Sequence, residues 1–88
     1  MIINEVDMII EEVRKIISGI IEVPAEKIKE DASFINEYGM DSLRVLEILA
    51  NLENKFEIVI DPEKLVSMTN LAEVTKIIEQ CLKEKENE

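Results

Sequence analysis

Apolar residues recur at every third or fourth position in three stretches of this chain, which is the period of one face of an α-helix. In the first stretch Asn4 can cap the start of a helix, and Gly19 can end it. The apolar face of this first predicted helix consists of Val6, Ile9, Ile10, Val13, Ile16 and Ile17.

The other two stretches predict helices in the middle and at the end of the chain. The middle helix is expected from about Asp41 to Lys55, because neither glycine nor proline interrupts that stretch. Its core positions are Leu46, Leu49, Leu52 and Phe56. Asn70-Leu71-Ala72-Glu73 resembles a capping box and opens the last helix. The apolar face of the last helix consists of Leu71, Val74, Ile77, Ile78, Cys81 and Leu82.

A long connection, about residues 20–38, separates the first two predicted helices. Pro24-Ala25-Glu26-Lys27 predicts a single turn within this connection, because proline suits the first position of a turn. So long a loop needs anchors in a small domain. Four apolar residues can pin it to the core, namely Val23, Ile28, Phe34 and Ile35.

The connection after the middle helix is shorter and has two parts. Phe56-Glu57-Ile58-Val59-Ile60 has the composition of a strand, but no other segment supplies a partner strand, so an extended connection is expected. Asp61 then caps a short helix with Pro62 at its first position, around Glu63 to Met68.

Together these elements predict an all-α fold. We expect a small four-helix bundle with three longer helices, one short helix and a long first loop. The 88 residues suffice for one small domain and are too few for two. We assign that domain to residues 1–82 and expect the charged stretch 83–88, which lacks apolar residues, to be a frayed tail.

The charge of the chain limits its partners. Twenty acidic against ten basic residues give a formal net charge of −10, which disfavours nucleic acid and anionic membrane surfaces. The start of the chain has neither a basic region nor a long apolar run, so we expect no signal peptide and no stable membrane insertion. Cys81 is the only cysteine, which suits a small buried apolar role in a reducing compartment, with the cytoplasm as the expected location.

The residue types present argue against catalysis. The chain has no histidine, so it cannot assemble a Ser-His-Asp or Cys-His apparatus. A lone cysteine offers no zinc-chelating set, and the acidic clusters do not follow the pattern of a calcium loop. Asp41 beside Ser42 is a poor base, because adjacent helical residues point in different directions. We therefore expect neither an enzyme nor a metal site.

One motif does point to chemistry, namely Gly39-Met40-Asp41-Ser42-Leu43 at the start of the middle helix. A helix N-terminus exposes unpaired N–H groups and the positive end of the helix dipole, so an anion attached to Ser42 would be stabilised there. On its own, an Asp-Ser-Leu tripeptide is most often an ordinary helix cap.

With the segments around it, from Ala32-Ser33-Phe34 to Ile60-Asp61-Pro62, this motif resembles an acyl carrier protein, and the resemblance extends from Val6 to Leu82. It implies that Ser42 carries a 4′-phosphopantetheine arm, transferred from coenzyme A by a magnesium-dependent phosphopantetheinyl transferase. The terminal thiol of that arm holds acyl groups as thioesters, and the carrier itself catalyses nothing.

The resemblance also implies roles for the neighbours of Ser42. Gly39 lets the loop turn sharply before the helix, Asp41 contributes a carboxylate at the transferase contact, and Leu43 presents an apolar side chain beside the arm or belongs to the core. Members of the family shelter acyl cargo between helices. By position the lining candidates are Phe34, Leu46, Leu49, Ile60, Leu65 and Met68, and permanent core is the alternative for each.

Docking of partner enzymes is expected on the middle helix, through Leu43, Arg44, Glu47 and Glu53. Arg44 and Asn54 occupy positions that are usually acidic in fatty-acid carriers, whereas Glu47 and Glu53 keep the usual charge. Tyr38 stands where leucine is common. Arg44 can pair with Glu47 one turn along the helix. These departures indicate a specialised pathway.

The leading hypothesis is therefore a monomeric acyl carrier for fatty-acid, lipid or polyketide-type biosynthesis. Its partners would be the transferase, enzymes that make or transfer acyl groups, and the acyl chain itself. Two alternatives stay open. One is an aminoacyl or peptidyl carrier, in which Arg44 is less surprising, and the other is a helical interaction module that is never modified.

Overall fold

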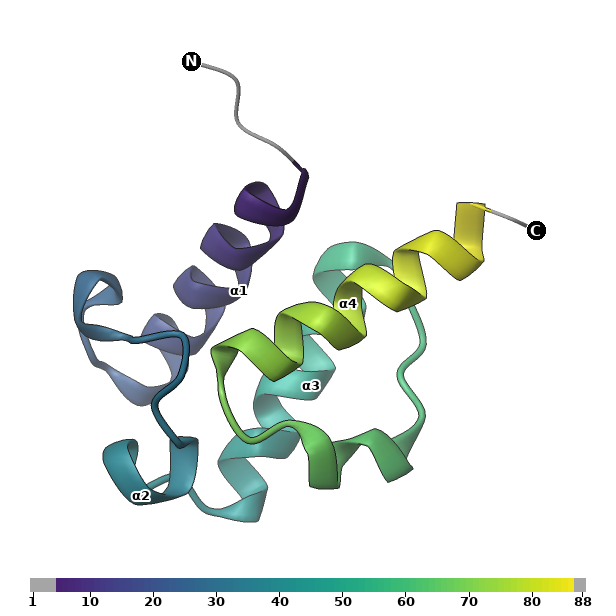
Figure 1. The fold of residues 1–88 in the computed structure, drawn as a ribbon. Helices are drawn as coiled ribbons and strands as arrows, with labels where there is room; N and C mark the ends of the chain where they lie inside the picture. The colour runs from purple at the N-terminus through teal and green to yellow at the C-terminus, as the bar shows by residue number, and fades with distance from the viewer. Residues whose placement is uncertain (1–4, 87–88) are drawn as a thin grey trace.

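In a computed structural model, residues 5–86 are described, and these residues form helices and connections without any strand. The all-α class predicted from the sequence is confirmed. The elements, in chain order, are α1 (Glu5–Ile21), the 3₁₀ turn η1 (Ala25–Lys27), α2 (Phe34–Tyr38), α3 (Ser42–Phe56), the 3₁₀ helix η2 (Pro62–Ser67) and α4 (Leu71–Glu86), as Figure 1 shows. Among the described helices, none has the length and apolar content needed to cross a membrane.

The three long helices enclose one apolar core. α1 packs against both α3 and α4, and η2 contacts α3 and α4. On α1 the predicted face is confirmed from Ile9 onward, since Ile9, Val13 and Ile17 are buried and Ile10 and Ile16 are half-buried at its edges. The side chain of Val6 lies outside the described part of the structure. The residues that complete the buried core are Ile28, Phe34, Met40, Val45, Ile48, Leu49, Leu52, Ile58, Ile60, Met68, Leu71, Val74 and Ile78.

The end of α1 differs from the prediction. The helix does not end at Gly19 but continues to Ile21, and Glu22 then takes a left-handed conformation with φ of 58°. The N–H of Glu22 donates to the carbonyl of Ser18 at 2.9 Å. Ile20 and Ile21 pack against the core, and this burial outweighs the modest cost of a glycine inside a helix. The predicted cap, Asn4, lies outside the described residues.

The connection after α1 is anchored largely as predicted. The turn at Pro24–Lys27 is confirmed as η1, Ile28 is buried and Val23 is half-buried. Two polar side chains add to these anchors. Arg14 Nε donates to the carbonyl of Ile28 at 3.2 Å, and the Tyr38 hydroxyl accepts from the N–H of Lys29 at 2.9 Å.

A short helix, α2, lies at the end of this connection, where the sequence predicted only loop. Ser33 caps it by accepting from the N–H of Asn36, and Gly39 ends it with φ of 63°. Phe34 is fully buried, as predicted. Ile35 was expected in the core but is 65% exposed, because neighbouring residues of a helix point about 100° apart.

The buried seam of α3 consists of Val45, Ile48, Leu49 and Leu52. The helix spans nearly the predicted range, and burial of Leu49 and Leu52 is confirmed. Leu46 was expected in the core, but it is 43% exposed because it lies one residue round the helix from Val45. Phe56 is only half-buried.

The connection from α3 to η2 is extended, as predicted. Ile58 and Ile60 are buried and Val59 is exposed, which is the alternation of an extended chain. A carboxylate oxygen of Glu53 accepts from the N–H of Ile60 at 2.9 Å. Asp61 accepts from the N–H of Glu63 and Pro62 follows it, so the predicted cap is confirmed, although the short helix is 3₁₀ rather than α.

α4 begins as the sequence predicts. Asn70 accepts from the N–H of Glu73 at 2.8 Å, which is one half of a capping box. The helix continues to Glu86, and Lys85 Nζ donates to the carbonyl of Glu57 at 2.9 Å. Residues 83–86 are thus helical and extend past the core.

Cys81 is half-buried on α4, with its Sγ 3.9 Å from the carbonyl oxygen of Val59. Burial raises the pKa of the Cys81 thiol above its ordinary value, and the nearby Glu84 carboxylate raises that pKa further. The thiol therefore stays protonated at neutral pH and serves as a small packing residue.

Gly19 and Gly39 predict opposite effects of the same substitution. A Cβ at either glycine would meet no atom within 4 Å, so only the backbone decides. Gly39→Ala should lower the free energy of unfolding by about 1 kcal/mol, because Gly39 is left-handed, whereas Gly19→Ala should raise it by about 0.5 kcal/mol in the helix. Urea unfolding measures both. Equal effects would contradict the conformational explanation.

Candidate functional site

The motif at the start of α3 presents one serine to solvent. Asp41 is the N-cap of α3, and its carboxylate accepts from the N–H of Arg44 at 3.0 Å. Ser42 is the first residue inside the helix and is exposed. In the Asp41-Ser42-Leu43 tripeptide the helix cap is thus Asp41, and the hydroxyl of Ser42 has no capping role.

The residues before Ser42 fix its position. Gly39 makes the left-handed turn that ends α2, so its predicted sharp turn before α3 is confirmed. Met40 is buried, and its N–H donates to the carbonyl of Phe34 at 3.1 Å. Three residues after Ser42, Val45 is buried as well. Because the side chains of Met40 before it and Val45 after it are buried, Ser42 is held in place while its own side chain stays accessible.

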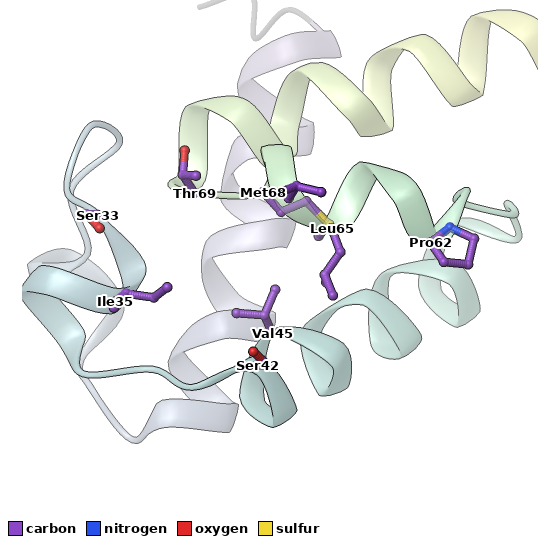
Figure 2. Close-up of a pocket in the computed structure, with 9 residues that line it drawn as sticks. Ser33, Ile35, Ser42, Val45, Pro62, Leu65, Met68 and Thr69 are labelled. Atoms are coloured by element: carbon purple, nitrogen blue, oxygen red, sulfur yellow. The ribbon is translucent and has the colours of Figure 1, made fainter.

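A pocket of about 370 Å³ lies beside Ser42, between α2, α3 and η2. Figure 2 shows Ser42 and Val45 on α3, with Leu65 and Met68 facing them, and Ile35 on α2 at the left of the view. The residues lining the pocket are Ser33, Ile35, Ser42, Val45, Pro62, Leu65, Val66, Met68 and Thr69.

Two of the six predicted lining residues, Leu65 and Met68, line this pocket. The other four do not. Phe34, Leu49 and Ile60 are buried in the core, and Leu46 lies on the exposed side of α3. Among the lining residues that sequence reasoning missed, Val45 had a usable signal, since it lies one helical turn after Ser42. Ile35 and Val66 had none, because only the fold brings them there.

Two backbone hydrogen bonds hold the connection before α2 against the segment that follows η2. The N–H of Phe34 donates to the carbonyl of Thr69 at 2.9 Å, and the N–H of Ala72 donates to the carbonyl of Glu30 at 3.0 Å. These bonds join residues that are 35 and 42 positions apart in the chain. They hold together the two segments that contribute Ser33 and Thr69 to the pocket lining.

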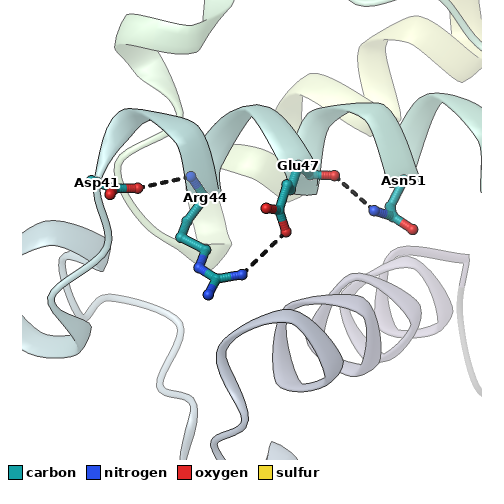
Figure 3. A network of polar contacts seen from close by, with 4 residues as sticks. All are labelled: Asp41, Arg44, Glu47 and Asn51. Carbon is teal, nitrogen blue, oxygen red and sulfur yellow. Dashed lines mark hydrogen bonds and ion pairs between the residues drawn. The ribbon is translucent and has the colours of Figure 1, made fainter.

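The docking candidates on α3 fall into two groups. Leu43, Arg44 and Glu47 are exposed, and Arg44 pairs with Glu47 at 3.3 Å, as Figure 3 shows. Asn51 Nδ2 donates to the carbonyl of Glu47 at 2.8 Å. Glu53 is half-buried, and its carboxylate holds the N–H of Ile60. The structure therefore gives Glu53 an internal role.

The site fits a phosphate-linked arm. Ser42 is exposed at the N-terminus of a 15-residue helix, where unpaired N–H groups and the helix dipole favour a negative group. The apolar lining of Val45, Leu65 and Met68 lies within reach of a chain that starts at Ser42. A group attached here would extend into solvent or along the pocket without disturbing the core.

Comparisons with known proteins identify the family. Residues 11–78 match the family model described as "Phosphopantetheine attachment site". The chain is 36% identical over 73 residues to an acyl carrier protein of Sinorhizobium fredii, covering 83% of this chain and 94% of the relative. It is 35% identical over 69 residues to an acyl carrier protein of Helicobacter pylori, covering 78% and 88%.

Two further similar proteins are a carrier named for a polyketide synthase and a chain in a solved structure. "Polyketide-8 synthase acyl carrier protein 1" of Streptomyces avermitilis is 33% identical over 71 residues, covering 81% of this chain and 84% of the relative. A chain in the solved structure described as "The ishigamide ketosynthase/chain length factor" superposes with a TM-score of 0.65 at 33% identity, covering 82% of this chain and 90% of that chain.

This chain belongs to the acyl carrier protein family. Its prosthetic group is 4′-phosphopantetheine, and it is a carrier rather than an enzyme. The carboxylate next to Ser42 in the chain, that of Asp41, accepts from the N–H of Arg44, which agrees with a serine that another enzyme modifies.

The capping geometry predicts different stabilities for two neighbouring variants. Asp41→Ala should lower the free energy of unfolding by about 1 kcal/mol, because the N–H of Arg44 loses its acceptor. Ser42→Ala should change it by less than about 0.5 kcal/mol, because its exposed hydroxyl caps nothing. Thermal and urea unfolding of both variants check this order, and a larger loss for Ser42→Ala would contradict the assignment of the cap.

Proposed function

We propose that this protein carries acyl intermediates as thioesters on a 4′-phosphopantetheine arm attached to Oγ of Ser42. The observation that carries the proposal is the exposed Ser42 at the start of α3, directly beside an apolar pocket. The carrier domain spans residues 1–82, and residues 83–88 form its charged tail. The protein acts as a monomer in the cytoplasm.

In this proposal a separate phosphopantetheinyl transferase joins the arm to Ser42. Gly39 and Asp41 position the serine, the first through its left-handed turn and the second through its cap. The phosphodiester that links the arm is an anion, which the N-terminus of α3 stabilises. The arm, when bound, supplies the thiol, and the protein supplies the position and the pocket.

The pathway is one of fatty-acid, lipid or polyketide-type synthesis, with acyl-handling enzymes of the ketosynthase type as partners. The names of the relatives support this choice, since one is a polyketide synthase carrier and another belongs to a ketosynthase/chain length factor structure. Arg44 and Asn54 support a specialised pathway, because they remove two charges expected of a fatty-acid carrier.

Mass spectrometry tests the attachment site. Incubation with coenzyme A, magnesium and a broad-specificity transferase should add one phosphopantetheine group to the wild-type protein and none to Ser42→Ala. Ser67→Ala is a matched control, since Ser67 is also an exposed helical serine, and this variant should be modified normally. An unmodified wild type, or modification that survives in Ser42→Ala, would refute the proposal.

Thermal unfolding tests the role of the pocket. Loading the arm with a medium-length acyl group should raise the melting temperature above that of the holo-protein, because cargo that binds only the folded state stabilises it. Val66→Asp should abolish this increase, since it puts a charge on the lining. Val59→Asp should keep the increase, because Val59 is equally exposed but does not line this pocket. Identical melting temperatures for wild-type holo and acyl forms would show that the cargo stays in solvent.

A further inference from the structure

The pocket beside Ser42 is apolar along most of its lining and polar along one edge. Its apolar lining consists of Ile35, Val45, Pro62, Leu65, Val66 and Met68. Apart from Ser42, its polar lining consists of Ser33 and Thr69. Figure 2 shows these two side chains at the left of the view, on the side of Ile35 and away from Pro62. We call Ser33 and Thr69 the polar edge.

Backbone hydrogen bonds hold the two residues of the polar edge in place. The N–H of Phe34, the residue after Ser33, donates to the carbonyl of Thr69 at 2.9 Å. The N–H of Thr69 donates to the carbonyl of Ser67 at 3.0 Å. These bonds use main-chain atoms only, so they position the two residues and leave their hydroxyl groups for other partners.

Both hydroxyl groups of the polar edge can still donate a hydrogen bond. The Ser33 oxygen accepts from the N–H of Asn36 at 3.2 Å, which leaves its own hydrogen to donate. Among residues 5–86, the Thr69 hydroxyl has no hydrogen-bond partner. A chain of methylene groups lying over this edge would take water away from the two hydroxyl groups and offer no hydrogen bond in return, which is unfavourable. A ligand oxygen at this edge would accept from them.

Charge narrows the class of ligand further. In the described structure none of the side chains that line the pocket is charged, so an ionised group would lose water there without gaining a partner. Exposed acids flank the lining residues in the chain, at Glu37, Asp41, Asp61 and Glu63, with Lys64 among them. A cargo carboxylate would be repelled by this acidic surround, and a cargo ammonium would pair with it instead of entering the pocket. The pocket therefore suits a neutral chain.

We propose that the pocket receives a neutral acyl chain that carries a keto or hydroxyl group, and that the polar edge binds the oxygen of this group while the apolar lining covers the carbons. The inference rests on the proposed attachment of the arm to Ser42 and names the class of cargo for the same pocket. Condensation of two acyl thioesters places a keto group on the β-carbon of the product, so we expect the oxygen at that carbon. Saturated chains and aminoacyl groups fit this lining less well.

Thermal unfolding tests this inference with acyl groups of one length. Octanoyl, β-ketooctanoyl and both epimers of β-hydroxyoctanoyl are each loaded from the acyl-coenzyme A by a broad-specificity transferase. The melting temperature should rise above that of the holo-protein by about 4 °C more with a β-oxygenated chain than with octanoyl, because one added hydrogen bond stabilises the loaded state. An ω-aminooctanoyl chain should give no increase over the holo-protein.

Variants of the polar edge separate hydrogen bonding from shape. Thr69→Val should keep the increase with octanoyl and lose the additional increase with the β-oxygenated chains, whereas Thr69→Ser should retain it. Ser33→Ala should reduce the additional increase as well. Each loaded variant is compared with its own holo-form, so loss of the Ser33 cap cancels. Ser67→Ala is the matched control, because Ser67 is exposed on η2 but does not line the pocket, and it should leave the additional increase unchanged.

The outcomes separate this inference from the proposed function. Equal increases for octanoyl and every β-oxygenated chain in the wild type would overturn the inference, and so would an additional increase that survives in both Thr69→Val and Ser33→Ala. An increase with ω-aminooctanoyl as large as that with octanoyl would overturn the neutral class of cargo. A wild type that accepts no arm at all would instead refute the attachment at Ser42, so the two failures are distinguishable.

Discussion

The burial of one seam on α3 fixes the orientation of the helix that begins at Ser42. Val45, Ile48, Leu49 and Leu52 face the core, and this fixes the rotation of the helix about its own axis. Leu46 is then directed outward. Ser42 precedes the buried Leu49 by seven residues and lies within about 20° of it around the helix axis, so the rotation of the helix alone would not expose it. The hydroxyl is accessible because the first turn of α3 borders the pocket instead of packed core.

The pocket follows from a second constraint, the way in which two distant connections meet. η2 lies beside α3, and the segment after η2 accepts the N–H of Phe34 through the carbonyl of Thr69. Phe34 is itself fully buried and fixes the start of α2. Beside α2 and α3, the third element at the pocket is η2, a six-residue 3₁₀ helix, rather than a long α-helix. An apolar hollow therefore remains beside Ser42 that a continuous helical layer would have filled.

A carrier needs little chemistry from its own residues, and the site agrees with that. The serine is exposed at the start of α3, and the carboxylate next to it in the chain, that of Asp41, is occupied with the cap of the helix. As a result, the residue proposed to carry the arm is not one of the residues that stabilise the fold. Removing the hydroxyl leaves the core untouched, whereas Gly39, Met40 and Asp41 keep both the fold of the turn and the position of the serine.

The sequence by itself determined the all-α class, the three long helices, the turns at Pro24 and Asp61, and the motif around Ser42. These features depend on local physics, namely helical periodicity, capping side chains and the freedom of Gly39, which neighbouring residues reveal. Resemblance to acyl carriers was also readable, since its residues lie in order along the chain.

The tertiary structure alone decided the end of α1 at Ile21, the existence of α2 and the exposed positions of Ile35 and Leu46. Each of these features depends on which face of a segment packs against the core. The spacing of apolar residues along the sequence does not decide which face that is where two apolar residues are adjacent. The pocket lining was undetermined for the same reason, because Ile35, Val45 and Val66 become neighbours only when three separate elements pack together.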